Sequence, residues 1–503
     1  MELFNHLLMG FSVALEPGNL IYCFLGVLIG TLVGVLPGIG PVGAMSLLLP
    51  ATFHISPVSS IIMLAGIFYG SQYGGSTTSI LVNIPGEAAS VMTCLDGYQM
   101  ARQGRAGPAL GIAAFGSFIA GTLGILGLIL IAPPLVDFAL RFGPPEYFSL
   151  MVLGLTILTF LTSSSMIRAL MMASLGLALG TVGLDTISGL SRFTFTVPEL
   201  LDGIGLVPLV MGLFGISEVL LNIERTIARD VFTTKVAGLL PSMADWARSI
   251  WAILRGTVIG FFLGTLPGGG AVISSFAAYA IEKRVSRHPE EFGRGAIEGV
   301  AAPEAANNSA AQASFIPLLT LGIPSNVTMA MLLGALIIQG VTPGPLLLSQ
   351  HPDLFWGVIA SMYVGNVMLL ALNLPLIGLW VRLLSVPYSI LFPLIVIFCM
   401  IGSYSINNST TDVLLMLGFG VAGYLLKKLS LETAPLVLAF VLGPMLETSL
   451  RQSLIKSEGG FGIFFSRPIS AVCLIAAFAL VVMPLLPWCQ RRPGALIDGE
   501  ETT

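Results

Sequence analysis

The chain contains many apolar runs long enough to cross a lipid bilayer as helices. A membrane-spanning helix needs about 20 predominantly apolar residues. Runs of this kind are Leu110–Leu130, Ile204–Leu221, Leu354–Leu374 and Ile469–Leu486. Only 10% of the residues are charged, against about 25% in a soluble domain, and a β-barrel would show shorter alternating segments. We therefore predict an all-α polytopic membrane protein with roughly 11–12 transmembrane helices.

The sequence lacks the motifs of several other function classes. It has no Gly-x-x-x-x-Gly-Lys-[Ser/Thr] phosphate loop, no His-Glu-x-x-His zinc motif and no basic run for nucleic acid. The first residues lack the Lys or Arg of a cleaved signal peptide. The five cysteines form no Cys-x-x-Cys pair, and we expect them to act as small apolar residues. We therefore expect neither a P-loop ATPase nor a metalloenzyme, and no organic cofactor.

An internal repeat divides the sequence into two related halves. Residues 26–42 read GVLIGTLVGVLPGIGPV and residues 256–272 read GTVIGFFLGTLPGGGAV, with the same glycine spacing and the same Leu-Pro-Gly motif. The likeness returns later, where Ile84-Pro85 corresponds to Ile323-Pro324. Repeats of this kind are typical of transporters. We predict an N-terminal repeat at residues 1–221, a cytoplasmic linker at 222–249 and a C-terminal repeat at 250–503.

Positive residues mark cytoplasmic loops, and they fall on opposite loops in the two halves. Residues 51–60 contain no Lys or Arg, whereas their counterpart Lys283–Arg294 contains four. Arg102 and Arg105 lie in the next loop of the first half, whose counterpart Gly340–Asp353 has none. This reversal is what inverted-topology repeats require.

The reversal continues toward the end of each half. Arg168 corresponds to Ser403–Asp412, which contains no Lys or Arg. The uncharged Gly180-Thr181 corresponds to Lys427-Lys428. The scheme places the N-terminus outside and both the linker and the C-terminus in the cytoplasm. The positive residues that it leaves outside, against the rule, are Arg141, Arg192 and those of Arg451–Arg467.

Each half carries a Pro-Gly motif within an apolar stretch, at Pro37–Pro41 and Pro267–Gly270. Proline removes a hydrogen-bond donor and glycine costs about 1 kcal/mol inside a helix, so both helices should break. We interpret the breaks as tips of re-entrant hairpins, whose free N–H groups favour an anion and whose free carbonyls favour Na⁺. The alternative is a packing kink. For Gly26, Gly30 and Gly34, on one helix face, we expect close helix packing.

Two further segments are polar in an apolar setting, Tyr69–Gly86 and Asn307–Asn326, and each contains an Ile-Pro break. Their amides and hydroxyls offer oxygens for Na⁺ and donors for a carboxylate. The alternative is hydrogen bonding between helices. Glu87 and Glu304 are the nearest carboxylates, either inside the membrane or at its edge. An anion among these segments would have no Lys or Arg beside it, which makes a co-bound cation attractive.

These features give two sets of candidate residues. The candidate substrate-binding residues are Pro37, Gly38, Gly40, Ser76, Thr77, Thr78, Pro267, Gly268, Gly269, Gly270, Asn308 and Ser325. The candidate Na⁺ ligands are Asn83, Asn307, Ser309 and Asn326.

At these motifs the sequence resembles the large membrane subunit of the tripartite tricarboxylate transporters, the TctA family. The residues that carry the resemblance are Gly30–Pro50, Phe68–Gly104, Gly264–Arg284 and Pro303–Pro345. The likeness covers nearly the whole chain, and motifs of this length are far more specific than a short glycine pattern.

The resemblance implies a secondary transporter of the cell inner membrane, driven by an ion gradient that is usually Na⁺. It also implies a small TctB-like membrane subunit, a TctC-like periplasmic solute-binding protein, and di- or tricarboxylate substrates such as citrate. A passive anion channel is the alternative within transport. A membrane-embedded enzyme and a structural subunit are alternatives of other classes, and we find no Ser/His or paired-Asp set that would support catalysis.

The inverted topology predicts that reporters fused within Lys283–Arg294 and within residues 51–60 appear on opposite sides of the membrane. The Lys/Arg bias of the two loops is the physical reason. A pair of fusions to a phosphatase that is active outside and to a fluorescent protein that is active inside measures it. Both reporters on the same side would contradict the scheme.

Overall fold

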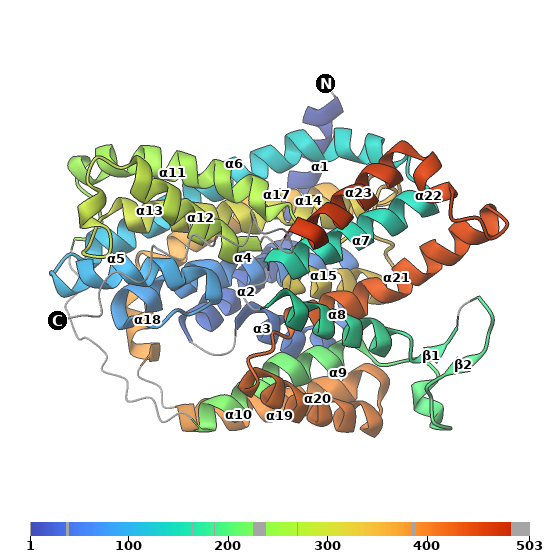
Figure 1. Cartoon of the computed structure of the whole chain (residues 1–503). Coiled ribbons are helices and arrows are strands. Elements are labelled where there is room, and N and C mark those ends of the chain that lie inside the picture. The colour runs from blue at the N-terminus through green and yellow to red at the C-terminus, as the bar shows by residue number, and fades with distance from the viewer. Residues whose placement is uncertain are drawn as a thin grey trace.

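The computed structural model describes residues 2–36, 40–161, 165–185, 187–224, 238–268, 270–384 and 388–483, and these are almost entirely helical (Figure 1). The described strands form one small antiparallel hairpin of β1 (Gly183–Leu184) and β2 (Ser191–Arg192). Seven of the described helices are long and apolar enough to span a membrane, and six more apolar helices are shorter. The predicted all-α polytopic membrane fold is confirmed, while the inverted repeat and the re-entrant hairpins stay predictions.

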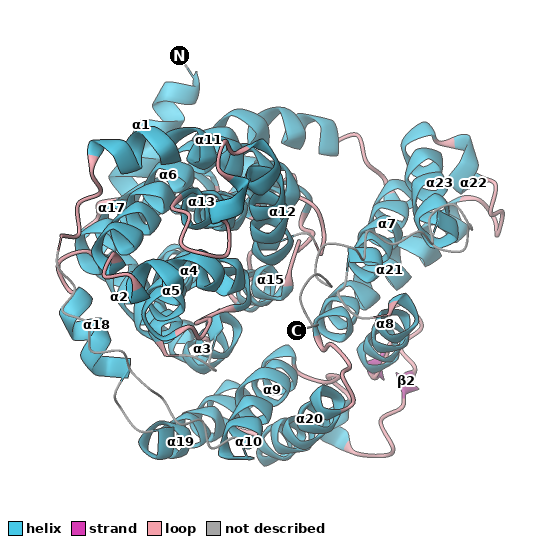
Figure 2. Ribbon diagram, turned by 60° about the vertical axis from the view of Figure 1, so that its left-hand side comes forward, coloured by secondary structure: helices cyan, strands magenta, loops and turns pink. Residues whose placement is uncertain are grey.

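The helices lie in three groups that Figure 2 separates. The largest, which we call the central group, mixes helices of both sequence halves. Its members are α1 (Glu2–Ala14), α2 (Pro17–Val35), α3 (Gly40–Leu48), α4 (Pro57–Val82), α5 (Val91–Arg102), α6 (Ala106–Ala139), α11 (Met243–Gly264), α12 (Gly270–Val285), α13 (Glu298–Ala313), α14 (Phe315–Leu321), α15 (Val327–Ile338), α16 (Leu347–Gln350), α17 (Pro352–Asn373) and α18 (Ile377–Leu384), with the 3₁₀ turns η1 (Pro50–His54), η2 (Ala88–Ser90) and η5 (Pro289–Glu291).

Two smaller groups flank the central group, and each again joins helices from both halves (Figure 2). The α21 group consists of α7 (Pro144–Leu161), α8 (Met166–Gly180), α21 (Ala434–Lys456), α22 (Ile463–Ser466) and α23 (Pro468–Val482). The α20 group consists of α9 (Leu206–Val210), the π-helical η4 (Met211–Ile216), α10 (Ser217–Glu224), α19 (Tyr388–Asn407) and α20 (Thr410–Lys428). The remaining turn, η3 (Pro198–Leu200), follows the β hairpin. Helices α10 and α11 extend into the two ends of the predicted 222–249 linker.

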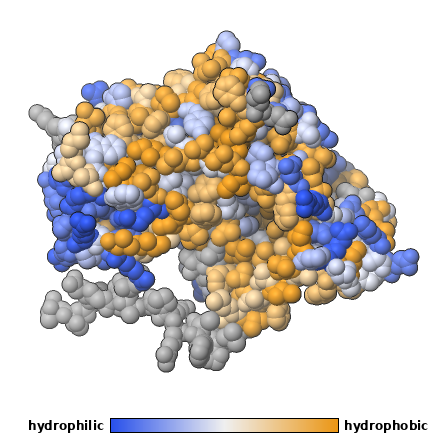
Figure 3. Space-filling view, turned by 90° about the horizontal axis from the view of Figure 1, so that it is seen from above, coloured by the Kyte–Doolittle hydropathy of each residue, from blue (hydrophilic) through white to orange (hydrophobic). Residues whose placement is uncertain are grey.

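The surface has the polarity expected of a membrane protein. Figure 3 shows hydrophilic residues at the left and right of one face, with a mostly apolar surface between them. Large apolar side chains are exposed on helices of all three groups, such as Phe262 on α11, Phe398 on α19 and Phe478 on α23. Exposed apolar side chains in such numbers are stable in lipid rather than in water.

Helix α2 packs on α4 through its glycine face. A Cβ atom on any of these glycines would lie within 3.0 Å of α4 backbone atoms, so only glycine allows this approach. The pairs are Gly26 with Met63, Gly30 with Ile67 and Gly34 with Ser71. Backbones that approach this closely are held by van der Waals contact, as in other small-residue helix interfaces. The close packing predicted for these three glycines is confirmed.

Helix α11 packs on α13 in the same manner in the second half. The corresponding pairs are Gly256 with Ala302, Gly260 with Ala306 and Gly264 with Ala310. In both halves, therefore, the helix that precedes the Pro-Gly motif lies against the helix that carries the polar segment.

Loops that share a predicted side of the membrane lie together. On the predicted cytoplasmic side, Gln103 donates from Nε2 to the Arg294 carbonyl at 2.7 Å. On the predicted outer side, Gln339 donates to the carbonyl of Thr52 at 2.8 Å. Likewise, Arg168 and Lys427 line one cavity, and Thr181 and Asn407 line another. These contacts fit the side that the Lys/Arg pattern assigns to each loop.

The arginines that break the positive-inside pattern are mostly paired with carboxylates. Arg192 contacts Glu447 at 2.9 Å, Arg451 contacts Asp185 at 2.8 Å, and Arg467 contacts Glu146 at 3.0 Å. The hydrogen bonds from Arg451 hold the pKa of the Asp185 carboxyl below its usual range. The charge at this end of the molecule is therefore neutralised locally.

Replacing Gly260 by Ala should destabilise the protein by about 1–3 kcal/mol, because the new Cβ forces α11 away from α13. Gly418→Ala in α20 is the matched control, since its Cβ would meet nothing within 4 Å. Thermal unfolding in detergent should show a lower melting temperature for Gly260→Ala only. Equal melting temperatures for the two variants would contradict the packing argument.

Candidate functional site

Both helices with a Pro-Gly motif end at that motif. In the first half α2 ends at Val35 and α3 begins at Gly40. The candidate residues Pro37 and Gly38 fall outside the described residues, as does Gly269 of the second half. In the second half α11 ends at Gly264 and α12 begins at Gly270.

The Pro-Gly turn of the second half contacts the Ile-Pro break of the same half. Gly268 has a φ of 77°, a conformation that favours glycine, and its N–H donates to the Ser325 carbonyl at 2.8 Å. Pro267 packs against Gly154 of α7. The candidate residues Pro267, Gly268 and Ser325 are therefore brought together, at the border between the central group and the α21 group.

The first half repeats this contact. A Cβ on Gly86, which follows the Ile84-Pro85 break, would lie within 3.0 Å of the Gly34 carbonyl near the end of α2. In addition, Thr78 donates from Oγ1 to the Val35 carbonyl at 2.8 Å. This hydrogen bond satisfies one of the carbonyls that a broken helix leaves without a partner. Thr78 thus has a structural role at the break.

The two polar segments form the buried centre of the molecule. Every residue of α4 from Ser59 to Leu81 is buried, and so is every residue of α13. A helix buried all round is usually apolar all round, yet these two carry amides, hydroxyls and a carboxylate. Polar groups at this depth are costly and mark functional pathways in membrane proteins.

Glu304 of α13 is 0% exposed, whereas Glu298 at the start of the same helix is also buried but pairs with Arg248. Ser76 of α4 donates from Oγ to Glu304 Oε2 at 2.5 Å, and Thr93 of α5 donates to the other oxygen. Asn308 donates from Nδ2 to Ser117 Oγ of α6 at 2.7 Å and to the Glu304 carbonyl at 3.0 Å. We call Glu304, Ser76, Thr93, Asn308 and Ser117 the Glu304 cluster. Among the described residues, the Glu304 carboxylate pairs with hydroxyl groups and with no Lys or Arg.

Glu87 lies next to this cluster and is half-buried in the turn after α4. Asn307 donates from Nδ2 to Glu87 Oε1 at 3.2 Å, and the N–H of Ala89 donates to Oε2 at 2.7 Å. Of the two carboxylates whose depth the sequence leaves open, Glu304 is therefore fully enclosed, while Glu87 caps the short η2 helix.

Several amide side chains near the centre keep an oxygen without a hydrogen-bond partner in the described structure. Buried amide oxygens normally accept a hydrogen bond. These atoms are Gln72 Oε1, Asn307 Oδ1, Asn308 Oδ1, Gln312 Oε1 and Asn373 Oδ1. Together with the carboxylates they form an oxygen-rich environment, which is the chemistry that hard cations prefer.

The other candidate Na⁺ ligands have different surroundings. Asn326 caps α15, since its Oδ1 accepts from the N–H of Met329 at 2.9 Å. Ser309 donates to the Thr257 carbonyl of α11 at 2.8 Å, which joins two helices. Asn83 ends α4 in a left-handed conformation with its side chain exposed. Of the four, Asn307 is the one whose side chain contacts a carboxylate in the described structure, that of Glu87.

The sequence reasoning missed three polar residues of the centre. Ser117 and Asn373 are isolated polar residues within long apolar helices, and such a residue in a membrane helix is itself a signal. Thr93 gives no such signal, because α5 is polar along much of its length. Its role depends on a contact with α13 that only the fold creates.

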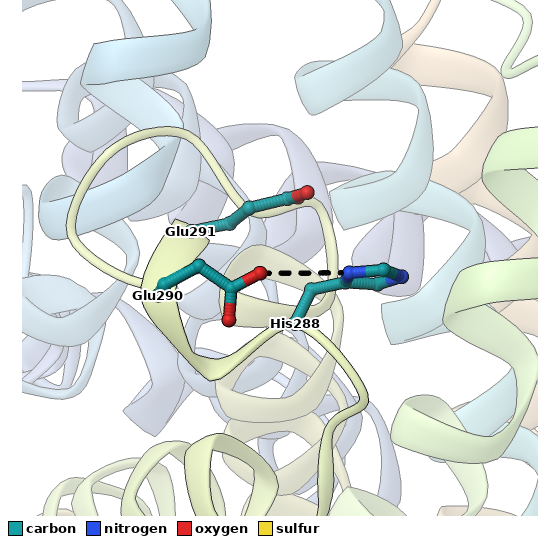
Figure 4. A group of neighbouring side chains, drawn as sticks. All are labelled: His288, Glu290 and Glu291. Carbon is teal, nitrogen blue, oxygen red and sulfur yellow. Dashed lines mark ion pairs between the residues drawn. The ribbon is translucent and has the colours of Figure 1, made fainter.

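A surface group of His288, Glu290 and Glu291 has side chains close enough to hold a metal ion (Figure 4). His288 and Glu290 are 50% and 68% exposed, with 3.6 Å between Nδ1 and Oε1. Glu291 pairs with Arg248 at 2.7 Å. Because this group is exposed and partly neutralised, it carries much less weight as a functional site than the buried Glu304 cluster.

The capping role of Asn326 gives a test that separates structure from ion binding. Asn326→Ala should cost about 1 kcal/mol through loss of the N-cap, and Asn326→Ser should keep most of that stability. Melting temperatures in detergent measure both variants. A large loss of stability in Asn326→Ser would contradict a simple capping role and favour the predicted role as a ligand.

The chain is similar to a known protein family and to two known proteins. The chain matches the tripartite tricarboxylate transporter TctA family over residues 20–438. It is 54% identical over 501 residues, 100% of both chains, to an uncharacterized 52.8 kDa protein in the TAR-I ttuC' 3' region of Agrobacterium vitis. It is 56% identical over 228 residues to an uncharacterized protein in the TAR-II ttuC' 3' region of that organism, covering 45% of this chain and 94% of the relative.

No solved structure matches the chain. The family match nevertheless covers most of the sequence, including both Pro-Gly motifs and the helices that carry the Glu304 cluster. A multi-pass helical membrane fold with a polar, fully buried centre agrees with it. The chain therefore belongs to the tripartite tricarboxylate transporter TctA family.

Proposed function

We propose that this chain is the large permease subunit of a tripartite system and that it imports di- or tricarboxylates, such as citrate, together with a cation, Na⁺. The family match supports a tricarboxylate transporter permease. The finer proposal depends on the enclosure of Glu304, which contacts hydroxyls and pairs with no Lys or Arg among the residues that the structure describes. Amide oxygens without a partner lie nearby on the same helix. A buried carboxylate without a cationic partner is costly, and either a proton or a bound cation has to neutralise it.

Cation coupling follows from charge. A substrate with two or three carboxylates that approached this centre alone would add negative charge to that of Glu304. Moving unpaired charge out of water costs many kcal/mol. A cation that enters with the substrate lowers that cost, so substrate and cation bind better together than apart. The transmembrane gradient of the cation then drives the import of the carboxylate.

The substrate would bind near the Pro-Gly and Ile-Pro breaks. At the second break, the contact between Gly268 and Ser325 joins two interrupted backbones at one place. Interrupted helices supply free N–H groups for the carboxylates of a substrate. The candidate substrate-binding residues of both tips, together with Asn308, remain our proposed substrate site.

The remaining parts of the system are proposed from the family. A TctC-like periplasmic binding protein would deliver the substrate, and a small TctB-like membrane subunit would complete the complex in the inner membrane. Alternating access would move the central group against the α21 and α20 groups, in an elevator-like manner. The separation of the three groups in Figure 2 supports this division, and hinge or shear movement between packed helix groups is a common mechanism.

A passive anion channel is the second candidate within transport. It would need an open path lined by donors, whereas the buried centre is rich in acceptor oxygens and carboxylate. A membrane-embedded enzyme has less support, because the matching family is one of transporters.

Cells that express the chain with its two partner proteins should take up labelled citrate or another carboxylate only in the presence of a Na⁺ gradient. Asn308→Ala should lower this uptake at least about tenfold, because it removes the amide that positions Ser117 beside Glu304. Ser405→Ala, an exposed serine of α19 that bonds to its own helix, is the control.

Uptake that continues unchanged after the ion gradient is collapsed would contradict symport and favour the channel. Normal uptake by Asn308→Ala would remove the Glu304 cluster from the mechanism. A binding screen of carboxylates on the partner binding protein identifies the substrate independently of both results.

A further inference from the structure

A small cavity lies beside the Glu304 cluster. Its volume is about 20 Å³, and its lining includes Ser76 and Thr77 of α4, Ser117 of α6 and Asn373 of α17. Tyr73 completes the polar part of the lining, and the rest is apolar. A cavity of about 10–15 Å³ is enough for one water molecule. The cavity therefore has room for a single small particle with polar contacts on several sides.

The oxygen of Asn373 is the group that most needs a partner there. Asn373 is only 4% exposed, and its Nδ2 donates to the Leu369 carbonyl of its own helix at 2.9 Å. Its Oδ1 has no hydrogen-bond partner among the described residues. A buried acceptor of this kind costs about 1–3 kcal/mol if it stays unsatisfied. An occupant of the cavity that interacts with lone pairs would remove that cost.

Two hydroxyl residues of the lining donate their protons to other groups. The Ser76 hydroxyl donates its proton to Glu304 at 2.5 Å, and the Tyr73 hydroxyl donates to Asn366 at 3.0 Å. A hydroxyl that donates elsewhere can still accept or ligate through its oxygen. Both residues line the same cavity as Asn373, so their oxygens can serve an occupant as further acceptors.

The negative charge of Glu304 favours a cation as the occupant of the cavity. Ser76 links the cavity directly to Glu304, and Ser117 links it to Asn308 of the same cluster. An occupant therefore lies one hydroxyl away from an enclosed carboxylate. A monovalent cation balances the single charge of Glu304, whereas a divalent cation would leave an excess positive charge in a poorly solvated place. The neighbouring Glu87 contacts Asn307 and the N–H of Ala89 instead of a residue of the cavity.

We infer that this cavity is the binding site of the coupling cation, a single dehydrated Na⁺ held by Ser76, Thr77, Ser117 and Asn373, with Glu304 as its counter-charge. The inference rests on the proposed cation-coupled transport and assigns that cation a place. It differs from the ligands expected from the sequence, because Asn83, Ser309 and Asn326 lie in other surroundings.

The site also explains how a cation affects the whole protein. Helices α4 and α6 belong to the first sequence half, whereas α13 and α17 belong to the second. A cation with ligands on α4, α6 and α17, and its counter-charge on α13, holds the two halves together at their centre. Binding and release of Na⁺ would thus favour different packings of the central group, as coupling requires.

Equilibrium binding of radioactive Na⁺ to the full chain with its partner membrane subunit, in lipid nanodiscs, tests the site. Wild type should bind Na⁺, and an excess of Ca²⁺ should not displace it. Ser117→Ala and Asn373→Ala should each weaken binding at least about tenfold, since each removes one of a few ligands. Glu304→Gln should abolish binding while keeping the shape of the side chain.

Ser361→Ala is the matched control, because the hydroxyl of this buried serine of α17 donates to the Val358 carbonyl of its own helix and the residue does not line the cavity. It should bind Na⁺ like wild type. Size-exclusion profiles show whether each variant remains folded. Because Ser117 and Asn373 lie on different helices, the test does not depend on a single variant.

Unchanged Na⁺ affinity in both Ser117→Ala and Asn373→Ala would overturn the site even if wild-type uptake depends on Na⁺. Absence of Na⁺ binding in wild type would also overturn it and make water the occupant. Proton-driven carboxylate uptake by cells that express the complex would then preserve the proposal of cation-coupled transport. Conversely, loss of carboxylate uptake with normal, mutation-sensitive Na⁺ binding would refute the proposed function and keep the cation site.

Discussion

The close approach of glycine-faced helices is the interaction on which the rest of the structure depends. Helix α2 lies against α4, and α11 lies against α13, at a distance that any Cβ atom on the glycine face would prevent. In lipid, apolar side chains gain nothing from leaving the solvent, so tight contact between backbones has to supply the attraction. These two contacts enclose α4 and α13, and only enclosed helices can carry polar groups at membrane depth.

Charge is distributed in keeping with that enclosure. At the ends of the molecule, arginines and carboxylates pair directly, as Arg248 does with Glu298 and Arg467 with Glu146. At the centre, the Glu304 carboxylate meets only hydroxyls among the described residues, and amide oxygens nearby lack donors. These arginines are thus neutralised by carboxylates of the same chain, whereas the centre has an excess of acceptor oxygens. That difference is the basis of our proposal that a transported cation binds at the centre and not at the charged surface.

The sequence predicted the fold class, the broken helices and the glycine packing because each depends on local composition or spacing. It also pointed to Ser76 and Asn308, since polar residues in apolar runs are visible without a structure. It could not rank Glu304 above Glu87, because burial depends on how α13 is surrounded. Likewise, Asn326 resembles a ligand in sequence but caps a helix, and Thr93 becomes relevant only through a contact with a residue 211 positions away.

The distance along the chain between partners has a consequence for synthesis. Ser76 and Glu304 are separated by 228 residues, which a ribosome working at about 5–20 residues per second needs roughly 11–46 s to cover. Helix α2 is made before α4, so α4 can cover the glycine face of α2 as soon as α4 has been inserted. The hydroxyl face of α4, however, stays without its carboxylate partner until the second half has been made. The newly inserted first half is therefore an incomplete intermediate, which has to persist in the membrane while the rest of the chain is translated.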